Sequence, residues 1–156
     1  MSQENLNKAL GEVIPLVVEG ATRLAADQLQ TDIMKRIFEI GSDANGKVIK
    51  NGIGYTDAYA KYRRAVGRQV TKIDLQLTGD LMRSITRVDT TQGVNVIFNN
   101  DFEAEKARYL ERNLGRFVGG GSQQIFFPSD IEADKALDLI EQTFIKTLDE
   151  LVARYS

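Results

Sequence analysis

The chain contains no cysteine and no histidine among its 156 residues. Without cysteine it can form no disulfide, no thiolate metal site and no cysteine nucleophile. Without histidine it lacks the commonest general base and the commonest ligand of transition metals. Chemistry based on carboxylates or lysine remains open, but the two absences weigh against an enzyme. We therefore predict a protein that is not a catalyst and needs no cofactor.

Long apolar runs and a strong net charge are also missing. No stretch approaches the roughly 20 apolar residues that span a bilayer. The first residues, Met-Ser-Gln-Glu, hold an early acid in place of the basic region of a secretory signal. We expect a soluble protein, made in the cytoplasm, that does not bind membranes. The net charge of −2 says little about partners. The 42% share of hydrophobic residues and the length predict a single domain over residues 1–156.

Helical periodicity is clearest at the two ends of the chain. Apolar residues recur at steps of three or four from Ser2 to about Ile40, and Gly41 is predicted to end this helix. Pro15 predicts a kink or a fresh helix start. A capping-box pattern, Ser129 with Glu132, opens the last helix. Its predicted buried face consists of Ala133, Leu137, Ile140, Phe144, Leu148, Leu151 and Tyr155.

The last helix also carries a series of carboxylates near its start. Their spacing matches no known cation-binding loop, so we interpret them as the solvated exterior of the helix. These residues are Asp130, Glu132, Asp134, Asp138 and Glu141.

The middle of the chain predicts two further helices and a small sheet. The helices cover residues 55–70 and about 101–113, the second with Asp101 as its N-cap. The fold class is α+β, with a small, mostly antiparallel sheet packed against the long N- and C-terminal helices. The predicted strands are Lys72–Leu77, Thr86–Val88, Val94–Phe98 and Ile125–Phe127.

Two glycine-rich excursions, residues 41–54 and 115–124, interrupt these elements. The first holds two Asn-Gly pairs, which favour tight hairpin turns. It can be a surface loop or a hairpin arm that orders only against a neighbouring subunit. Both excursions contain apolar residues that are better buried than left in water. We predict that they are flexible in the free monomer and contact other subunits or partner proteins, through Val48, Ile49, Ile53, Phe117 and Val118.

One segment holds a marked run of positive charge, with Tyr59 and Tyr62 beside it. Its five cations fall within twelve residues without an acid between them: Lys61, Arg63, Arg64, Arg68 and Lys72. Such a face can bind phosphates by an attraction that ignores sequence and weakens with salt. Residues 59–72 are therefore a candidate nucleic-acid-binding module. The alternatives are a solvated face and a docking surface for an acidic partner, such as the C-terminal helix of this or the next subunit.

The segment Asp74–Ile85 carries the most information about function. Leu75 and Leu77 alternate with polar neighbours, as in an extended segment with one buried face. Thr78 is predicted to cap the short helix that follows, and Gly79 to give the junction conformational freedom.

This segment resembles the central signature of the tail-completion and head–tail connector proteins of long-tailed phages. The signature positions are Leu75, Thr78, Gly79, Leu81, Ser84 and Ile85. The order of elements is similar too: residues 108–115 look like the family's Tyr-Ala and Gly segment, and residues 124–128 stand where its Arg-Pro-Phe strand belongs. Leu110 departs from the usual alanine, and Gln123-Gln124 replace Arg-Pro.

The resemblance implies a small α+β subunit that catalyses nothing and assembles as a homo-oligomeric ring. The ring would lie in the virion, at the neck, after assembly in the host cytoplasm. Its implied partners are other virion proteins, such as the portal, the adaptor and the tail-tube or terminator proteins, around the DNA channel. The basic segment would then face either these proteins or, through non-specific contact, the packaged DNA.

Overall fold

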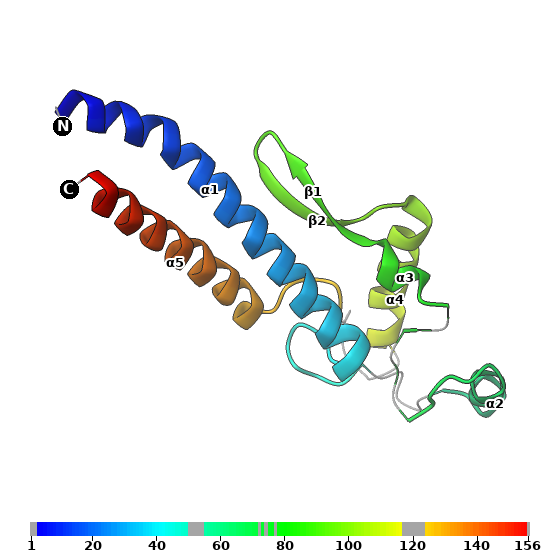
Figure 1. The fold of residues 1–156 in the computed structure, drawn as a ribbon. Coiled ribbons are helices and arrows are strands. Elements are labelled where there is room, and N and C mark those ends of the chain that lie inside the picture. The colour runs from blue at the N-terminus through cyan, green and yellow to red at the C-terminus, as the bar shows by residue number, and fades with distance from the viewer. Residues whose placement is uncertain are drawn as a thin grey trace.

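Two long helices dominate the computed structural model, which describes residues 3–49, 55–71, 73, 75–76, 78–116 and 124–155. Helix α1 (Gln3–Met34) continues into a π-helical segment, η1 (Lys35–Ile40), and α5 (Asp130–Tyr155) returns antiparallel beside α1. The free ends of α1 and α5 lie together, at the tip of a helical hairpin that extends away from the rest of the molecule (Figure 1). The predicted terminal helices are confirmed.

Local signals in the sequence explain where these helices begin and end. Gly41 adopts a left-handed conformation (φ 78°), and its N–H donates to the carbonyl of Arg36, which closes η1 as predicted. Pro15 lies inside α1, which continues through it without a fresh start. At α5 the capping box is confirmed, because Ser129 N donates to Glu132 Oε2 and Glu132 N donates to Ser129 Oγ.

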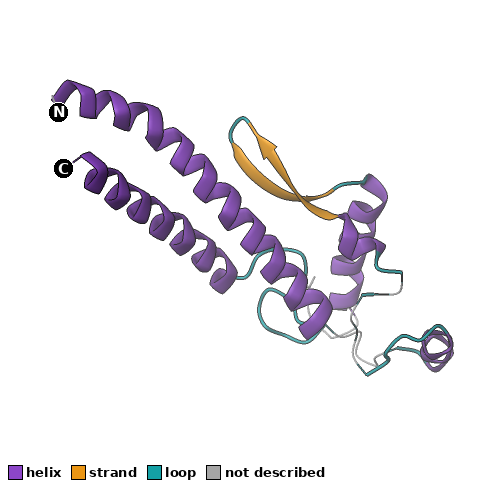
Figure 2. Cartoon of the chain, in the orientation of Figure 1, coloured by secondary structure: helices purple, strands orange, loops and turns teal. Residues whose placement is uncertain are grey.

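A two-stranded antiparallel sheet packs on α1 (Figure 2). Strand β1 (Ile85–Thr90) pairs with β2 (Gly93–Phe98), with Ile85 opposite Phe98 and Thr90 opposite Gly93. Gln30 of α1 donates to the carbonyl of Ile85 over 2.9 Å and ties the base of the sheet to the helix. The α+β class is confirmed.

Two of the four predicted strands are wrong in the described part of the chain. Ile125 and Phe126 form no strand, because their N–H groups donate to the carboxylate of Glu111. In the range 72–77, the described residues form no strand either. Leu75 in this range has a left-handed backbone, with φ 54°, and this conformation is incompatible with a β-strand.

Three shorter helices complete the described part of the fold: α2 (Asp57–Ala65), α3 (Asp80–Ser84) and α4 (Asp101–Arg116). Helix α2 is shorter than predicted, and Gly67 (φ 72°) turns the chain just beyond it. The predicted N-cap of α4 is one residue off. Asn100 caps the helix, because its Oδ1 accepts from Glu103 N over 2.8 Å.

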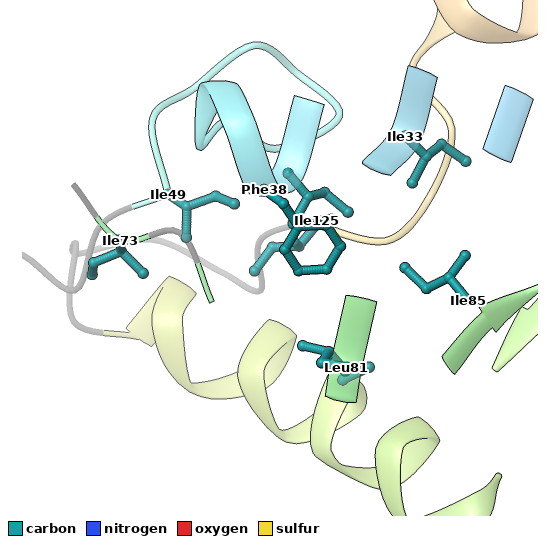
Figure 3. Close-up of a cluster of buried hydrophobic side chains, with 9 residues drawn as sticks. Ile33, Phe38, Ile49, Ile73, Leu81, Ile85 and Ile125 are labelled. Carbon is teal, nitrogen blue, oxygen red and sulfur yellow. The ribbon is translucent and has the colours of Figure 1, made fainter. Parts of the chain in front are cut away.

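The hydrophobic core lies at the base of the helical hairpin, where η1, α3, α4 and β1 meet (Figure 3). Burying a side chain the size of isoleucine contributes about 1.5–3 kcal/mol. The core members are Ile33, Ile37, Phe38, Ile49, Ile73, Leu81, Ile85, Ala107 and Ile125.

Ile49 belongs to this core, with 1% of its surface exposed. Its N–H donates to the carbonyl of Gly41, and Ser42 forms a β-bridge with Val48. Buried Asp43 closes the turn between them by accepting from two backbone N–H groups through Oδ1. The prediction that Ile49 contacts another subunit is therefore wrong, because its own chain already buries it.

The predicted buried face of α5 holds only in part. Ala133, Ile140 and Phe144 are half-buried, but Leu137 is 63% exposed. Glu132 is the reverse case. We expected it on the exterior of the helix, and it is 6% exposed because Arg36 pairs with it.

Candidate functional site

The basic segment forms helix α2, whose ends are set by its own sequence. Thr56 Oγ1 accepts from Tyr59 N, which caps the N-terminus, and Asp57 lies in the first turn near the positive end of the helix dipole. Arg63 and Arg64 lie in the last turn, near the negative end. In Figure 1, α2 lies at the end of the molecule opposite the free ends of α1 and α5. It therefore does not dock on the C-terminal helix of its own chain.

Arg63 is not a surface cation. Only 1% of it is exposed, its guanidinium lies 4.5 Å from the ring centroid of Tyr55, and its Nε donates to the carbonyl of Gln69 over 3.0 Å. A second nitrogen lies 3.4 Å from the carbonyl of Gln76. The prediction that Arg63 faces DNA or a partner is wrong. Arg63 instead holds the chain that follows α2 against the helix.

Three other cations of the segment are exposed: Lys61, Arg64 and Arg68. None of the three side chains forms an ion pair with another described residue. Beside them Tyr59 and Tyr62 stack with their ring centroids 6.2 Å apart, and both rings are exposed. The fifth predicted cation, Lys72, lies outside the described residues. The surface of α2 thus combines positive charge with aromatic and aliphatic area.

The signature residues surround the start of α3. Gly79 is the N-cap in a left-handed conformation (φ 86°), which confirms its predicted role at the junction. Thr78 lies one residue before the position predicted for it. Its Oγ1 still accepts from the first helical N–H, that of Asp80, over 3.4 Å. Leu81 and Ser84 are buried beneath this turn.

The carboxylate of Asp80 accepts hydrogen bonds from two side chains of the signature turn. Thr78 Oγ1 donates to its carboxylate over 2.6 Å, and the Arg83 guanidinium donates to the other carboxylate oxygen. These hydrogen bonds, the one from Thr78 first, lower the pKa of Asp80 below the ordinary value of 3.8. Arg83 also donates to the carbonyl of Thr78, so the turn is held on both sides of Gly79.

A cavity of about 390 Å³ lies between α2 and the signature turn. Its walls include the Tyr55 and Tyr59 rings, Leu81, Lys106 of α4 and the backbone of Gly79. The lining is mainly apolar, and its charged members are Arg63, Asp80 and Lys106.

Two polar anchors hold the base of the molecule, and neither was predicted from the sequence. The first is Arg36 in η1, which is 7% exposed. Its Nε donates to Glu132 Oε1 over 2.8 Å, and its other nitrogens donate to the carbonyls of Ser42, Ile125 and Phe127. One guanidinium therefore joins η1, the excursion after it, the segment before α5 and the start of α5.

The second anchor is Glu111 of α4, in the stretch that resembles the family's Tyr-Ala and Gly segment. Its Oε1 accepts from Ile125 N over 3.1 Å and from Phe126 N over 3.0 Å. The carboxylate thereby takes the place of a neighbouring strand for residues 125–126.

Apolar side chains remain exposed along the helical hairpin. On both helices these residues lie beyond the core, towards the free ends. They are Leu16, Val18 and Leu24 on α1 and Leu137, Ile145 and Val152 on α5, and each is at least 43% exposed. Leu16, at 67%, is the most exposed of the six.

The other residues that the sequence singled out are the predicted subunit contacts and Ser84. Val48 is 52% exposed and stays a predicted contact, whereas Ile53, Phe117 and Val118 lie outside the described residues. Ser84 donates from Oγ to the carbonyl of Leu81 over 2.7 Å, inside its own helix. Within the described ranges no group of acidic side chains is arranged to hold a metal ion. No helix in those ranges is long and apolar enough to cross a membrane.

Comparisons with known proteins give no family assignment. No family model, no curated protein and no solved structure matches this chain significantly.

Proposed function

We propose that the chain is a structural subunit of a phage neck, a head–tail connector or tail-completion protein that forms a ring. The observation that carries the proposal is the helical hairpin with its exposed apolar side chains, among them Leu16, Leu24, Leu137 and Ile145. Large apolar side chains left exposed on one projecting element are consistent with a surface that a partner covers. The signature turn around Gly79 adds the family resemblance to this architecture.

The proposal gives each part of the molecule a role. The base, where Arg36 and Glu111 anchor the chain, carries the projecting parts. The helical hairpin and α2 extend from it in different directions (Figure 1). A subunit with contact surfaces on different sides can join identical neighbours head to tail, and such contacts close into a ring when the rotation fits.

A nucleic-acid-binding module is the competing function, and the exposed cations of α2 favour it. Each phosphate neutralised on duplex DNA contributes about −0.9 to the slope of log affinity against log salt. Contacts by Lys61, Arg64 and Arg68 alone would give a slope of about −3, which corresponds to weak binding at physiological salt. The burial of Arg63 removes one cation from this surface. The observations therefore favour a protein partner.

Genetic complementation tests the proposal in a phage that encodes the chain. Without the protein, we expect filled heads and free tails to accumulate separately in electron micrographs. The variant Leu16→Asp/Ile145→Asp should keep the circular dichroism spectrum of the folded protein but fail to join heads to tails. Asn7→Asp/Gln142→Asp, at exposed polar positions on the same helices, changes the net charge by the same amount; it is the matched control and should complement. Normal particles without the protein would overturn the proposal.

A further inference from the structure

Charge is divided unevenly between the two ends of the molecule. The helical hairpin, residues 3–40 and 130–155, holds thirteen acidic and seven basic residues. Residues 41–129 hold nine acidic and thirteen basic residues. The hairpin is thus acidic, and the region that contains α2 is basic. Copies of one chain with this division attract each other head to tail and repel each other when like ends meet.

The acidic charge of α5 is concentrated in one exposed stripe. Its members follow one another at steps of 4, 3, 4, 4 and 3, which places them on one face of the helix. All are exposed: Asp134, Asp138, Glu141, Ile145, Asp149 and Val152. The four carboxylates form no ion pair with a described residue.

The exposed surface of α2 complements this stripe in spacing as well as charge. Lys61 and Arg64 lie three residues apart on α2, as Asp138 and Glu141 do on α5, whereas Arg68 follows beyond the end of α2, after the left-handed Gly67. When the two helices are aligned antiparallel, Lys61 faces Glu141 and Arg64 faces Asp138, and Arg68 adds a further positive charge at the end of α2. The aromatic rings beside the cations then have Ile145, one turn beyond Glu141, as an apolar neighbour.

We infer that the exposed face of α2 docks on the α5 stripe of a second copy of this chain. This inference rests on the proposed ring and names its interface. The contact is heterologous, because it joins different surfaces of two identical subunits, so a pair of subunits still has one free α2 and one free stripe for further neighbours. The anchoring of the chain around Arg63 gives α2 a fixed presentation for docking.

Charge reversal in the full-length protein tests the inference, with sedimentation velocity in about 50 mM salt as the readout, where charges are little screened. Variant A carries Lys61→Glu, Arg64→Glu and Arg68→Glu. Variant B carries Asp134→Lys, Asp138→Lys and Glu141→Lys. Each variant alone should associate at least about tenfold more weakly than the wild type, because like charges then face each other. Mixed in equal amounts, A and B should associate again, because every α2 meets a stripe of opposite charge.

A matched control separates this contact from a general effect of charge. Lys35→Glu, Arg108→Glu and Arg112→Glu change the net charge as variant A does, at exposed positions elsewhere, and should leave association within about twofold. A wild type that stays monomeric at a few hundred micromolar, or A and B that do not rescue each other, overturns the inference. Duplex DNA binding lost in A and unchanged in B, with association unaffected by either, assigns α2 to nucleic acid instead. The result expected for a phage without the protein, separate heads and tails, does not depend on any of these outcomes, so the ring proposal and this inference can fail separately.

Discussion

The buried pair of Arg36 and Glu132 gives the sharpest test of how this fold is held together. The two side chains are 7% and 6% exposed, and Arg36 Nε lies 2.8 Å from Glu132 Oε1. Removing the charge of one partner in a buried pair costs about 3–5 kcal/mol, because the other charge stays buried without compensation. We expect Glu132→Gln to lie near the low end of this range, because glutamine retains the carbonyl oxygen and can still accept one of the hydrogen bonds.

Arg36→Met should cost more than Glu132→Gln. Besides its ion pair, the guanidinium satisfies the carbonyls of Ser42, Ile125 and Phe127. A buried carbonyl that loses its donor costs about 1–3 kcal/mol. The sum is about 5 kcal/mol or more, which is comparable with the whole stability of many domains. Arg36→Met is therefore expected to be largely unfolded at 37 °C.

Thermal unfolding followed by circular dichroism at 222 nm measures both effects. For a chain of this length, 1 kcal/mol shifts Tm by roughly 2–4 °C, so Glu132→Gln should lower Tm by about 6–12 °C. Glu19→Gln is the matched control, because Glu19 forms an exposed pair with Arg23 on α1 and such pairs contribute about 0.5 kcal/mol. Equal Tm changes in Glu132→Gln and Glu19→Gln would refute the reasoning.

Two further predictions concern the signature turn. Gly79→Ala should lower the free energy of unfolding in urea by about 1–2 kcal/mol, because the residue is left-handed and a Cβ would lie 2.8 Å from Arg83 Nη1. Gly20→Ala, in open space on α1, should instead stabilise the protein by up to about 1 kcal/mol. For Asp80, the lowered pKa means a contribution to stability that is complete above the unfolded pKa, near 3.8, and is lost as pH falls through the folded value. Thr78→Val should raise the pKa of Asp80 in a carbon-13 NMR titration, and an unchanged pKa would contradict the role of the hydroxyl.

Local sequence signals predicted the long helices and their ends because the partners of those signals are near in sequence. The capping box of Ser129 and Glu132 spans three residues, and Gly41 ends η1 by its own backbone conformation. The sheet was harder to predict. Apolar residues 125–127 satisfy the pattern of a short strand, but a carboxylate on a distant helix, Glu111, takes their backbone N–H groups. Periodicity carries no information about such a partner.

The basic segment shows the same limit for the candidate site. Its cations look alike in the sequence, yet Arg63 is buried and Arg64 is exposed. Their exposure differs because neighbouring residues on a helix point about 100° apart. Arg63 faces Tyr55 and the chain after α2, and Arg64 points away from them. A helical projection of the sequence could predict that Arg63 and Arg64 lie on different faces of α2. It could not predict which face is covered, because that depends on the fold of the chain after α2.

The central claim is that this chain forms part of the phage neck, and the most direct measurement locates it in particles. Virions of a phage that encodes the chain can be purified, quantified by mass spectrometry and labelled with an antibody against the protein for electron microscopy. The account predicts a fixed copy number per particle, consistent with one ring, and label at the junction of head and tail. Absence of the protein from mature particles, or label away from that junction, would contradict it.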